Sequence, residues 1–347
     1  MTKDKIFEDI QNIVSANPVV IIGSGASVSY GIPGMGGLAE SLKDFFQPQS
    51  SEIIRTYKNR DSVDAINAFL KKLEEGFGLE EALLSIKVPE EVEHAIIYCV
   101  WKIISDADKK VYTRFINGEE IDLKSLFEYM IYGNQDKIIN VISTNYDKIA
   151  EYAASQTSAY INTGFTIGMK GYLKENVIDL PRKVEQDYIG FINILKVHGS
   201  LDWFKDNKGV VCYPNIDKIP DGYIPCIITP GTNKYERTQQ EPHRQLLSSI
   251  DKIFSKASGY LCIGYGFNDQ HVHPMLLKNA QKYRTKILIV TKDITPSIQQ
   301  NVIEKDYNFI IISSNGKEGT KITTLNDSIE IPNKIYWTIK GFEEIYK

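Results

Sequence analysis

The segment VVIIGSGASVSYGIPGMGG, residues 19–37, constrains the fold more than any other part of the chain. Its first four residues are β-branched, which is typical of a buried strand, and a glycine-rich turn follows directly. A buried strand that leads into such a turn is the usual way in which an α/β protein brings its backbone against a phosphate. We therefore expect a sheet whose first strand ends at a ligand site.

Strands and helices alternate along much of the remaining chain. Apolar strand patterns recur in KIINVIS, FINILKVHGS, GYLCIGYG, TKILIVT and YNFIIIS, and helical patterns separate most of them. This order predicts an α/β protein with a Rossmann-like doubly wound parallel sheet. Before KIINVIS, the apolar residues recur only at helical spacing over about a hundred residues, which predicts a large helical insertion.

We interpret residues 1–347 as a single domain. Its Rossmann-like core is predicted to comprise residues 16–37 and 137–315, with the helical insertion at residues 38–136. Residues 316–347 form a C-terminal extension, and its amphipathic tail, residues 326–347, can pack on the core or on a partner. The apolar fraction of 42% is sufficient for a substantial core.

Charge and hydropathy exclude several classes of function. The formal net charge is −4 and the chain has no dense Lys/Arg block, so we expect no direct nucleic-acid binding. No apolar run approaches the length that spans a bilayer, and the N-terminal segment is a charged amphipathic helix without a signal-peptide pattern. We therefore predict a cytoplasmic protein that does not bind membranes.

The cysteine and histidine spacings do not predict a metal site. The four cysteines form no C-x-x-C pair and are interpreted as buried, reduced thiols. Only His271 and His273 lie close together, without an evident third ligand, and a capping or surface role explains them. We expect no bound metal.

Polar residues and glycine follow three of the predicted strands, at Gly23–Ser27, Thr144–Asp147 and Gly264–Gly266. In an open parallel sheet, ligands bind outside the carboxyl ends of the strands. We therefore expect the three turns to meet at one crevice, and the ligand there to be a nucleotide.

The GSGAS turn alone does not decide which ligand binds, because a short G-x-G also serves as an ordinary tight turn. Val28 stands where the dinucleotide fingerprint requires its third glycine, and no Gly-Lys-Ser/Thr follows as in a P-loop. A dehydrogenase and an ordinary ATPase are therefore disfavoured.

His198 is the best candidate for a catalytic base. It ends an apolar strand and is followed by Gly199 and Ser200, which places its ring at the edge of the sheet. A neutral imidazole at this position can accept a proton from a sugar hydroxyl or a water. The alternative is a structural histidine that caps the strand.

The first glycine-rich turn resembles the Gly-Ala-Gly-x-Ser loop of the sirtuin superfamily. Gly23, Gly25 and Ser27 match that loop, with Ser24 in place of its alanine, and Gly31-Ile32-Pro33 matches the Gly-Ile-Pro that follows it. The resemblance implies that the pyrophosphate of NAD lies on this loop and on the helix that follows.

Two further motifs occur in the order found in sirtuins. Asn145 and Asp147 match a Thr-Gln-Asn-x-Asp motif, with Thr144 where glutamine is common, and His198-Gly199 matches the catalytic histidine and its glycine. The turn at Gly264 resembles the later Ile-Gly-Thr-Ser strand end, although Tyr265-Gly266 departs from it.

The departures from the family pattern bear on the reaction. Gly34-Met35-Gly36 stands where the deacylating sirtuins carry Asp-Phe-Arg, and only Cys212 and Cys226 lie where those enzymes have a four-cysteine zinc ribbon. In these respects the chain is similar to the bacterial sirtuin-like NADases of antiphage defence. That similarity implies hydrolysis of NAD to nicotinamide and ADP-ribose, and abortive infection through NAD depletion.

The resemblance assigns roles to individual residues. It implies that Asn145 orients the ribose hydroxyls or the attacking water, that Asp147 binds the nicotinamide carboxamide, and that His198 is the general base. For Asn268 and Asp269, contact with the adenosine ribose and an ordinary helix-capping role stay open. The predicted NAD-binding residues are Gly23, Ser24, Gly25, Ala26, Ser27, Thr144, Asp147, Gly264, Tyr265, Asn268 and Asp269.

Two other functions stay open. The first is a subunit that senses NAD or ADP-ribose, or acts as a scaffold, without turning the ligand over, and the second is an NAD-dependent protein deacylase. Uncontrolled hydrolysis would kill the host, so an NADase requires control. An activator encoded nearby, such as a HerA-type ATPase, an Argonaute-like protein or another sensor, is expected, as is a homo-oligomer.

Overall fold

The structure is a computed structural model that describes residues 2–47, 59–180, 187–230, 240–305 and 307–347. Parts of the predicted helical insertion and of the predicted core therefore lie outside the described residues. None of the helices in these ranges is both long and apolar enough to cross a membrane.

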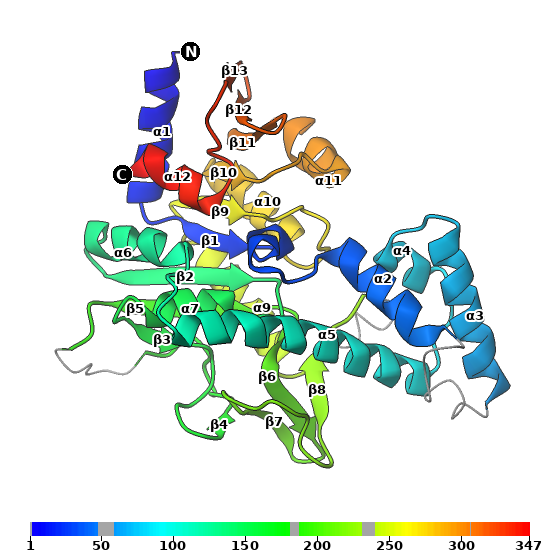
Figure 1. The fold of residues 1–347 in the computed structure, drawn as a ribbon. Coiled ribbons are helices and arrows are strands. Elements are labelled where there is room, and N and C mark those ends of the chain that lie inside the picture. The colour runs from blue at the N-terminus through cyan, green and yellow to red at the C-terminus, as the bar shows by residue number, and fades with distance from the viewer. Residues whose placement is uncertain (1, 48–58, 181–186, 231–239, 306) are drawn as a thin grey trace.

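A nine-stranded sheet forms the centre of the molecule, with the strand order β13-β12-β11-β10-β9-β1-β2-β5-β3 (Figure 1). The strands from β11 to β3 in this order are parallel, and β12 and β13 are antiparallel to their neighbours. The strands are β1 (Val19–Ile22), β2 (Ile138–Ser143), β3 (Tyr160–Asn162), β5 (Phe191–Lys196), β9 (Gly259–Ile263), β10 (Lys286–Val290), β11 (Phe309–Asn315), β12 (Gly319–Thr324) and β13 (Ser328–Ile331).

Successive residues of the parallel strands enter two different hydrophobic cores. In β1, Val20 and Ile22 belong to the core on one face of the sheet, and Val19 and Ile21 to the core on the other. Both faces are covered, which explains why these strands are apolar throughout and do not alternate with polar residues. This arrangement confirms the predicted Rossmann-like doubly wound α/β fold.

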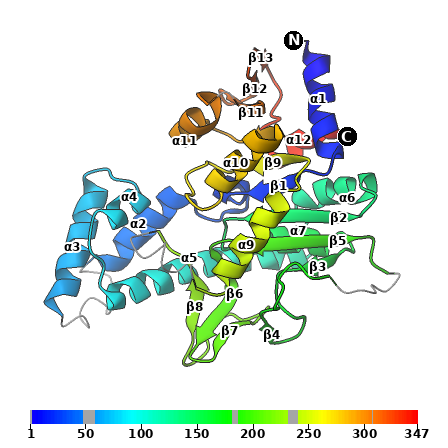
Figure 2. The same cartoon turned by 180° about the vertical axis from the view of Figure 1, so that it is seen from behind.

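Helices cover both faces of the sheet (Figures 1 and 2). One core includes residues of α1 (Lys3–Ser15), α6 (Leu123–Gly133), α7 (Ile149–Ser155) and α12 (Ile339–Tyr346). The other core includes residues of α9 (His243–Phe254), α10 (His273–Tyr283), α11 (Pro296–Ile298) and the π-helical turn η4 (Gln299–Ile303).

Between β1 and β2 the described chain is helical, as the spacing of its apolar residues predicts. The helices before α6 are α2 (Met35–Phe46), α3 (Arg60–Glu74), α4 (Leu79–Leu84) and α5 (Glu90–Ile116). The long helix α5 reaches from the group formed by α2, α3 and α4 to α7 beside the main sheet (Figure 1). The helices between β1 and β2 therefore contact α7, the helix that follows β2 in the sequence.

A second, four-stranded sheet has the order β4-β7-β6-β8. Its strands are β4 (Gly171–Tyr172), β6 (Gly199–Asp206), β7 (Gly209–Cys212) and β8 (Ile224–Ile227). Gly199 has φ +86°, and a Cβ there would lie 2.0 Å from the carbonyl oxygen of Cys226. Only glycine allows this turn, which carries the chain from the main sheet into the second sheet directly after His198.

The C-terminal residues continue the main sheet and then return to the N-terminal helix. β12 pairs with β11 and β13 with β12, and α12 then packs against α1. The side-chain amide of Gln11 donates to the carbonyl oxygen of Ile345 at 2.8 Å. The last two strands thus extend the main sheet, and the last helix packs on the first.

Candidate functional site

The sheet has a topological switch point at β1. From β1 the strand order runs through β2, β5 and β3 on one side and through β9, β10 and β11 on the other. A crevice at the carboxyl ends of the strands next to such a point is the usual ligand position in an open α/β sheet. The predicted site residues follow β1, β2, β5 and β9, so all four groups lie at this edge.

The glycine-rich turn after β1 packs its backbone against the turn after β9. The amide of Gly23 donates to the carbonyl oxygen of Ile263 at 3.0 Å, and that of Gly25 to the carbonyl oxygen of Gly264 at 3.0 Å. A Cβ at Gly23 would lie 2.5 Å from the oxygen of Gly264, and a Cβ at Gly25 would lie 2.8 Å from its Cα. The close approach of the two turns thus requires these glycines, while Ser24 and Gly25 stay exposed at the edge.

The backbone after this turn differs from the expectation of a helix directly behind the glycines. Two short 3₁₀ turns, η1 (Ser24–Ala26) and η2 (Val28–Tyr30), follow instead, and α2 begins only at Met35. Gly31 ends the second turn in the left-handed conformation, and Pro33 has no amide to continue a helix. The helix α2 and its dipole therefore begin ten residues beyond Gly25, whose amide already donates to the carbonyl oxygen of Gly264.

Asn145 links the turn after β2 to the glycine-rich turn. Its side-chain Nδ2 donates to the carbonyl oxygen of Gly23 and to Oγ of Ser27, both at 3.0 Å. The preceding residue, Thr144, donates its amide to the carbonyl oxygen of Ile22 at 3.0 Å. Asn145 and Ser27 are buried, so these hydrogen bonds are shielded from water and fix the two turns against each other.

His198 and Asp269 form a close pair at the same edge. Nε2 of His198 lies 2.5 Å from Oδ2 of Asp269, and its Nδ1 lies 3.3 Å from the carbonyl oxygen of Thr144. The other carboxylate oxygen, Oδ1, accepts from the amides of His271 and Val272 at 2.7 and 2.9 Å. Both ring nitrogens of His198 therefore face oxygen atoms, one on a carboxylate and one on the backbone.

Asp147 faces the interior of the protein. It is buried, and its Oδ1 accepts from the amide of Ile149 at 3.2 Å, at the start of α7. Burial raises the pKa of Asp147 to about 6, although the nearby ammonium of Lys196 acts in the opposite direction. The carboxylate thus supports the turn from within, and its contact with nicotinamide stays a prediction.

Tyr265 and Asn268 belong to the same turn after β9 as Asp269. The buried ring of Tyr265 packs at 4.9 Å from that of Phe267, so this side chain is turned away from solvent. Asn268 is exposed, and its Oδ1 accepts from Oγ of Ser297 in α11 at 2.5 Å.

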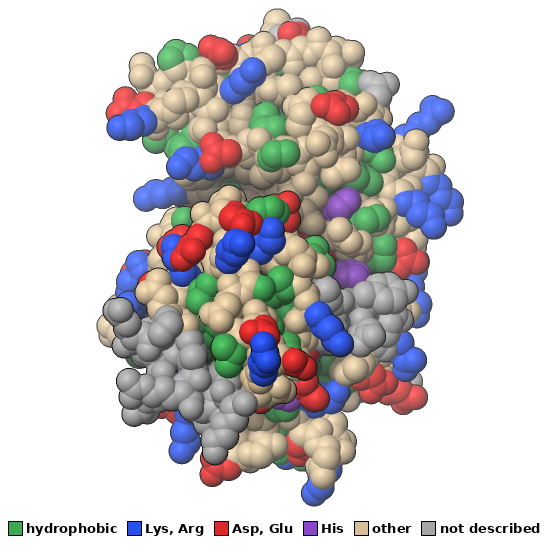
Figure 3. All heavy atoms as spheres, turned by 90° about the vertical axis from the view of Figure 1, so that its right-hand side faces the viewer, with side chains coloured by type: hydrophobic (Ala, Val, Ile, Leu, Met, Phe, Trp, Pro, Cys, Tyr) green, Lys and Arg blue, Asp and Glu red, His purple; other side chains and the backbone are tan. Residues whose placement is uncertain are grey.

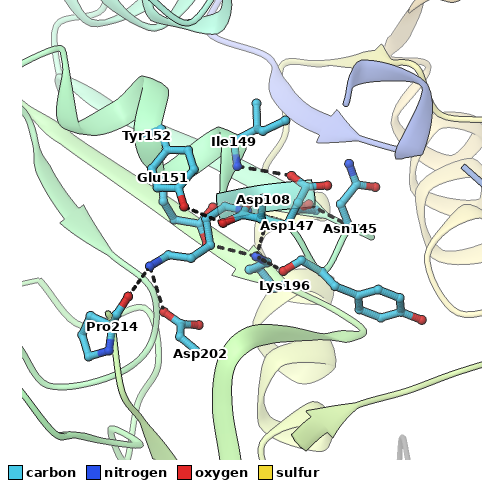
Figure 4. Close-up of polar contacts among 12 residues, drawn as sticks. Asp108, Asn145, Asp147, Ile149, Glu151, Tyr152, Lys196, Asp202 and Pro214 are labelled. Carbon is cyan, nitrogen blue, oxygen red and sulfur yellow. Dashed lines mark hydrogen bonds and ion pairs between the residues drawn. The ribbon is translucent and has the colours of Figure 1, made fainter. Parts of the chain in front are cut away.

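Sequence reasoning missed a buried network of charged side chains behind the Asn145 turn (Figure 4). Lys196 is 1% exposed and lies 3.1 Å from Oε1 of Glu151. Lys148 lies 3.6 Å from Asp202, and its amide donates to Asp108 of α5 at 2.9 Å. The sequence did carry a signal for a buried charge, because Lys196 is the one charged residue in the apolar run FINILKV. Its partners could not be identified, because they are distant in sequence.

A cavity of about 590 Å³ lies near this edge, between the second sheet and the N-terminal ends of α5 and α9. Its lining includes Cys226, Ile228 and His243, and the amide of Ile228 donates to the carbonyl oxygen of His198 at 2.8 Å. Figure 3 shows acidic and basic side chains interspersed over the face that lies at the right of Figure 1.

Sγ of Cys226 lies 3.7 Å from Nε2 of His243, a contact between one cysteine and one histidine. All four cysteines are buried and form no disulfide bond. No group of three or more His, Cys, Asp or Glu side chains is placed to hold a metal ion within these ranges.

Comparison with known proteins identifies one matching family model, described as a SIR2-like domain, over residues 139–312. No curated protein gives a significant match. Similar solved structures include a Sir2 homologue in complex with NAD. The two chains are 13% identical, the match covers 88% of this chain and 87% of that chain, and the TM-score is 0.45. A Sir2 homologue mutant in complex with ADP-ribose has 16% identity, coverage of 88% and 90%, and a TM-score of 0.44. A Sir2 bound to an acetylated peptide has 13% identity, coverage of 89% and 92%, and a TM-score of 0.41.

Proposed function

The chain belongs to the family of SIR2-like domains, and on that premise we propose that it hydrolyses NAD to nicotinamide and ADP-ribose. The sequence resemblance assigns the glycine-rich turn to the pyrophosphate, Asn145 to the ribose or the water, and His198 to proton transfer. An NAD-related activity is what the family supports most directly. Hydrolysis of NAD is a more specific statement than NAD-related activity, and it rests on the sequence resemblance described above.

One observation supports the proposal: the turns that carry the two candidate catalytic residues contact each other beside the switch point. Asn145 bonds to Gly23 and Ser27 of that turn, and the carbonyl oxygen of the residue before it, Thr144, lies 3.3 Å from the His198 ring. The turns that carry an orienting amide and a proton acceptor thus lie next to each other, where a nucleotide is expected.

The reaction breaks the bond between the nicotinamide nitrogen and C1′ of the ribose. The bonding electron pair stays with nicotinamide, which leaves as a neutral ring, while a water oxygen forms the new bond to C1′. The water loses a proton, which His198 in its neutral form accepts directly or through a ribose hydroxyl. Asp269 then stabilises the resulting imidazolium, as a carboxylate does beside a catalytic histidine.

We also propose a role in bacterial antiphage defence, in which NAD depletion stops the infected cell. The stretch Gly34-Met35-Gly36 departs from the Asp-Phe-Arg of the deacylating sirtuins and supports hydrolysis over deacylation. Because such an enzyme must be silent before infection, the proposal includes an activator protein and self-assembly. A HerA-type ATPase, an Argonaute-like protein or another sensor would meet this requirement.

A non-catalytic NAD or ADP-ribose sensor is the second candidate, and one observation favours it. The protein itself occupies polar groups of both candidate residues: Nδ2 of Asn145 donates to Gly23 and Ser27, and the two ring nitrogens of His198 face Asp269 and the carbonyl oxygen of Thr144. A binding protein could keep all these contacts, whereas a hydrolase must free one ring nitrogen of His198 to accept the proton.

Nicotinamide release separates the two candidates. The purified chain is incubated with NAD, alone and with the product of its genomic neighbour, and nicotinamide is quantified by chromatography. The hydrolase predicts release that is lost in His198→Ala and kept in the control His94→Ala, whose imidazole lies on α5 and is 42% exposed. Binding of ADP-ribose without release under either condition would favour the sensor.

A further inference from the structure

Lys196 is a fully buried lysine at the end of β5. Its Nζ donates to the carbonyl oxygen of Tyr146 at 3.0 Å and to that of Asp147 in a shorter contact, and it lies 3.1 Å from Oε1 of Glu151 (Figure 4). The three donors of the ammonium group thus have three acceptors, and two of these acceptors are backbone carbonyls.

Both carbonyls belong to the turn that directly follows Asn145. Lys196 therefore fixes the peptide groups on either side of Asp147, while Asn145 itself reaches from the same turn to Gly23 and Ser27. A residue without a donor at position 196 would leave two buried carbonyls without this partner. The turn would then lose the contact that sets its backbone orientation.

Lys148 belongs to the same buried network but is bonded differently. Its Nζ donates to the carbonyl oxygen of Pro214 at 2.6 Å and lies 3.6 Å from Asp202, both outside the Asn145 turn. Both lysines thus belong to ion pairs in the interior, and only Lys196 also bonds to the carbonyls of the turn. This difference offers a matched control.

We propose that Lys196 is a positioning residue for Asn145. Its ammonium holds the carbonyls of Tyr146 and Asp147, and the turn so fixed presents the Asn145 amide to the glycine-rich turn. The consequence for catalysis rests on the proposed function, whereas the consequence for the backbone of the turn does not.

A merely structural ion pair with Glu151 makes a different prediction. Removing one member of a buried pair leaves the other charge uncompensated, and removing both relieves that cost. The test therefore compares Lys196→Met with the double variant Lys196→Met/Glu151→Gln, and both with the control Lys148→Met/Asp202→Asn. Unfolding temperature, kcat and KM for NAD are measured for each protein.

For a positioning role, the double variant is more stable than Lys196→Met, yet its kcat stays at least about tenfold below that of the wild type, since small misplacements of catalytic groups are costly. The control keeps kcat within a few-fold of the wild type. Recovery of kcat together with stability in the double variant would overturn the proposal.

Amide hydrogen exchange provides a readout that needs no turnover. Under native conditions, we expect the double variant to exchange faster than the wild type at residues 145–147 and equally fast in β10, while the control, whose first substitution follows these residues, is unchanged at both places. Unchanged exchange at residues 145–147 would overturn the role of Lys196 even if NAD is hydrolysed. Faster exchange in a protein that releases no nicotinamide would instead retain that role and reject the hydrolase.

Discussion

Nε2 of His198 lies 2.5 Å from Oδ2 of Asp269, although the two residues are 71 positions apart in the sequence (269 − 198). Asp269 thus joins the turn after β9 to the end of β5 across the switch point of the sheet. It was expected to contact the adenosine ribose or to cap a helix. The structure shows the backbone-capping contacts on one carboxylate oxygen and the histidine on the other.

Asp269→Asn tests whether this contact supports proton transfer. The asparagine oxygen can still accept from the amides of His271 and Val272, while its other group no longer offers a negative charge to the imidazole. We expect nicotinamide release to fall about 10²-fold or more, with little change in unfolding temperature. Asp251→Asn, at an exposed position, serves as the control. If Asp269→Asn releases nicotinamide at the wild-type rate and is as stable as the wild type, Asp269 has no part in the mechanism.

Asn145→Ala removes the amide that ties the two turns together. The carbonyl of Gly23 and the hydroxyl of Ser27 lose a buried donor, so we expect a loss of roughly 1–3 kcal/mol in the free energy of unfolding, and no detectable nicotinamide release. Urea denaturation and chromatography measure the two effects. Asn12→Ala, on the exposed side of α1, should change neither, and full activity of Asn145→Ala would contradict its assigned role.

Asp147 predicts a pH dependence of stability. Because burial raises its pKa from 3.8 to about 6, the folded state keeps a proton that the unfolded state releases between these values. The stabilising contribution is therefore full below about pH 4 and declines by roughly 3 kcal/mol as the pH rises through 6. Urea denaturation from pH 4 to 8 should show a smaller decline for Asp147→Asn than for the wild type. A parallel decline in both proteins would contradict the raised pKa.

Gly264 predicts a conformational requirement at the site. Its φ is +57°, and a Cβ there would lie 2.2 Å from the amide nitrogen of Ala26. We expect Gly264→Ala to lower the free energy of unfolding by roughly 2 kcal/mol or more. Gly36→Ala is the matched control, since a Cβ at this position in α2 meets no atom within 4 Å and should stabilise the helix by about 0.5–1 kcal/mol. Equal thermal stability of the two variants would contradict the packing described for the turns.

The fold could be predicted from the sequence because its strongest signals are local. Runs such as Val19–Ile22 and Phe309–Ile312 are apolar throughout, and only a sheet buried on both faces explains such runs next to amphipathic helices. The position of Asn145 and His198 at one edge also followed, because parallel strands present their carboxyl ends together.

The contacts within the site could not be predicted, because they depend on distant partners. The bond between Lys196 and the turn after Asn145 spans about 50 residues, and a lysine in an apolar strand does not reveal its acceptors. Gly23 and Gly25 were interpreted as leaving space for a phosphate. In the structure, the atom nearest to a Cβ built at either position belongs to Gly264. The short 3₁₀ turns after Gly23 depend on the same packing and were missed as well.

The central claim is that this chain cleaves NAD through His198. The most direct measurement is the rate of nicotinamide release from NAD by the purified wild type, by His198→Ala and by His94→Ala, each with and without the product of the neighbouring gene. The account predicts release by the wild type and by His94→Ala in at least one of these conditions, and a loss of about 10²–10⁴-fold in His198→Ala. Equal release by His198→Ala and the wild type, or no release by any of the three proteins while ADP-ribose still binds, would contradict it.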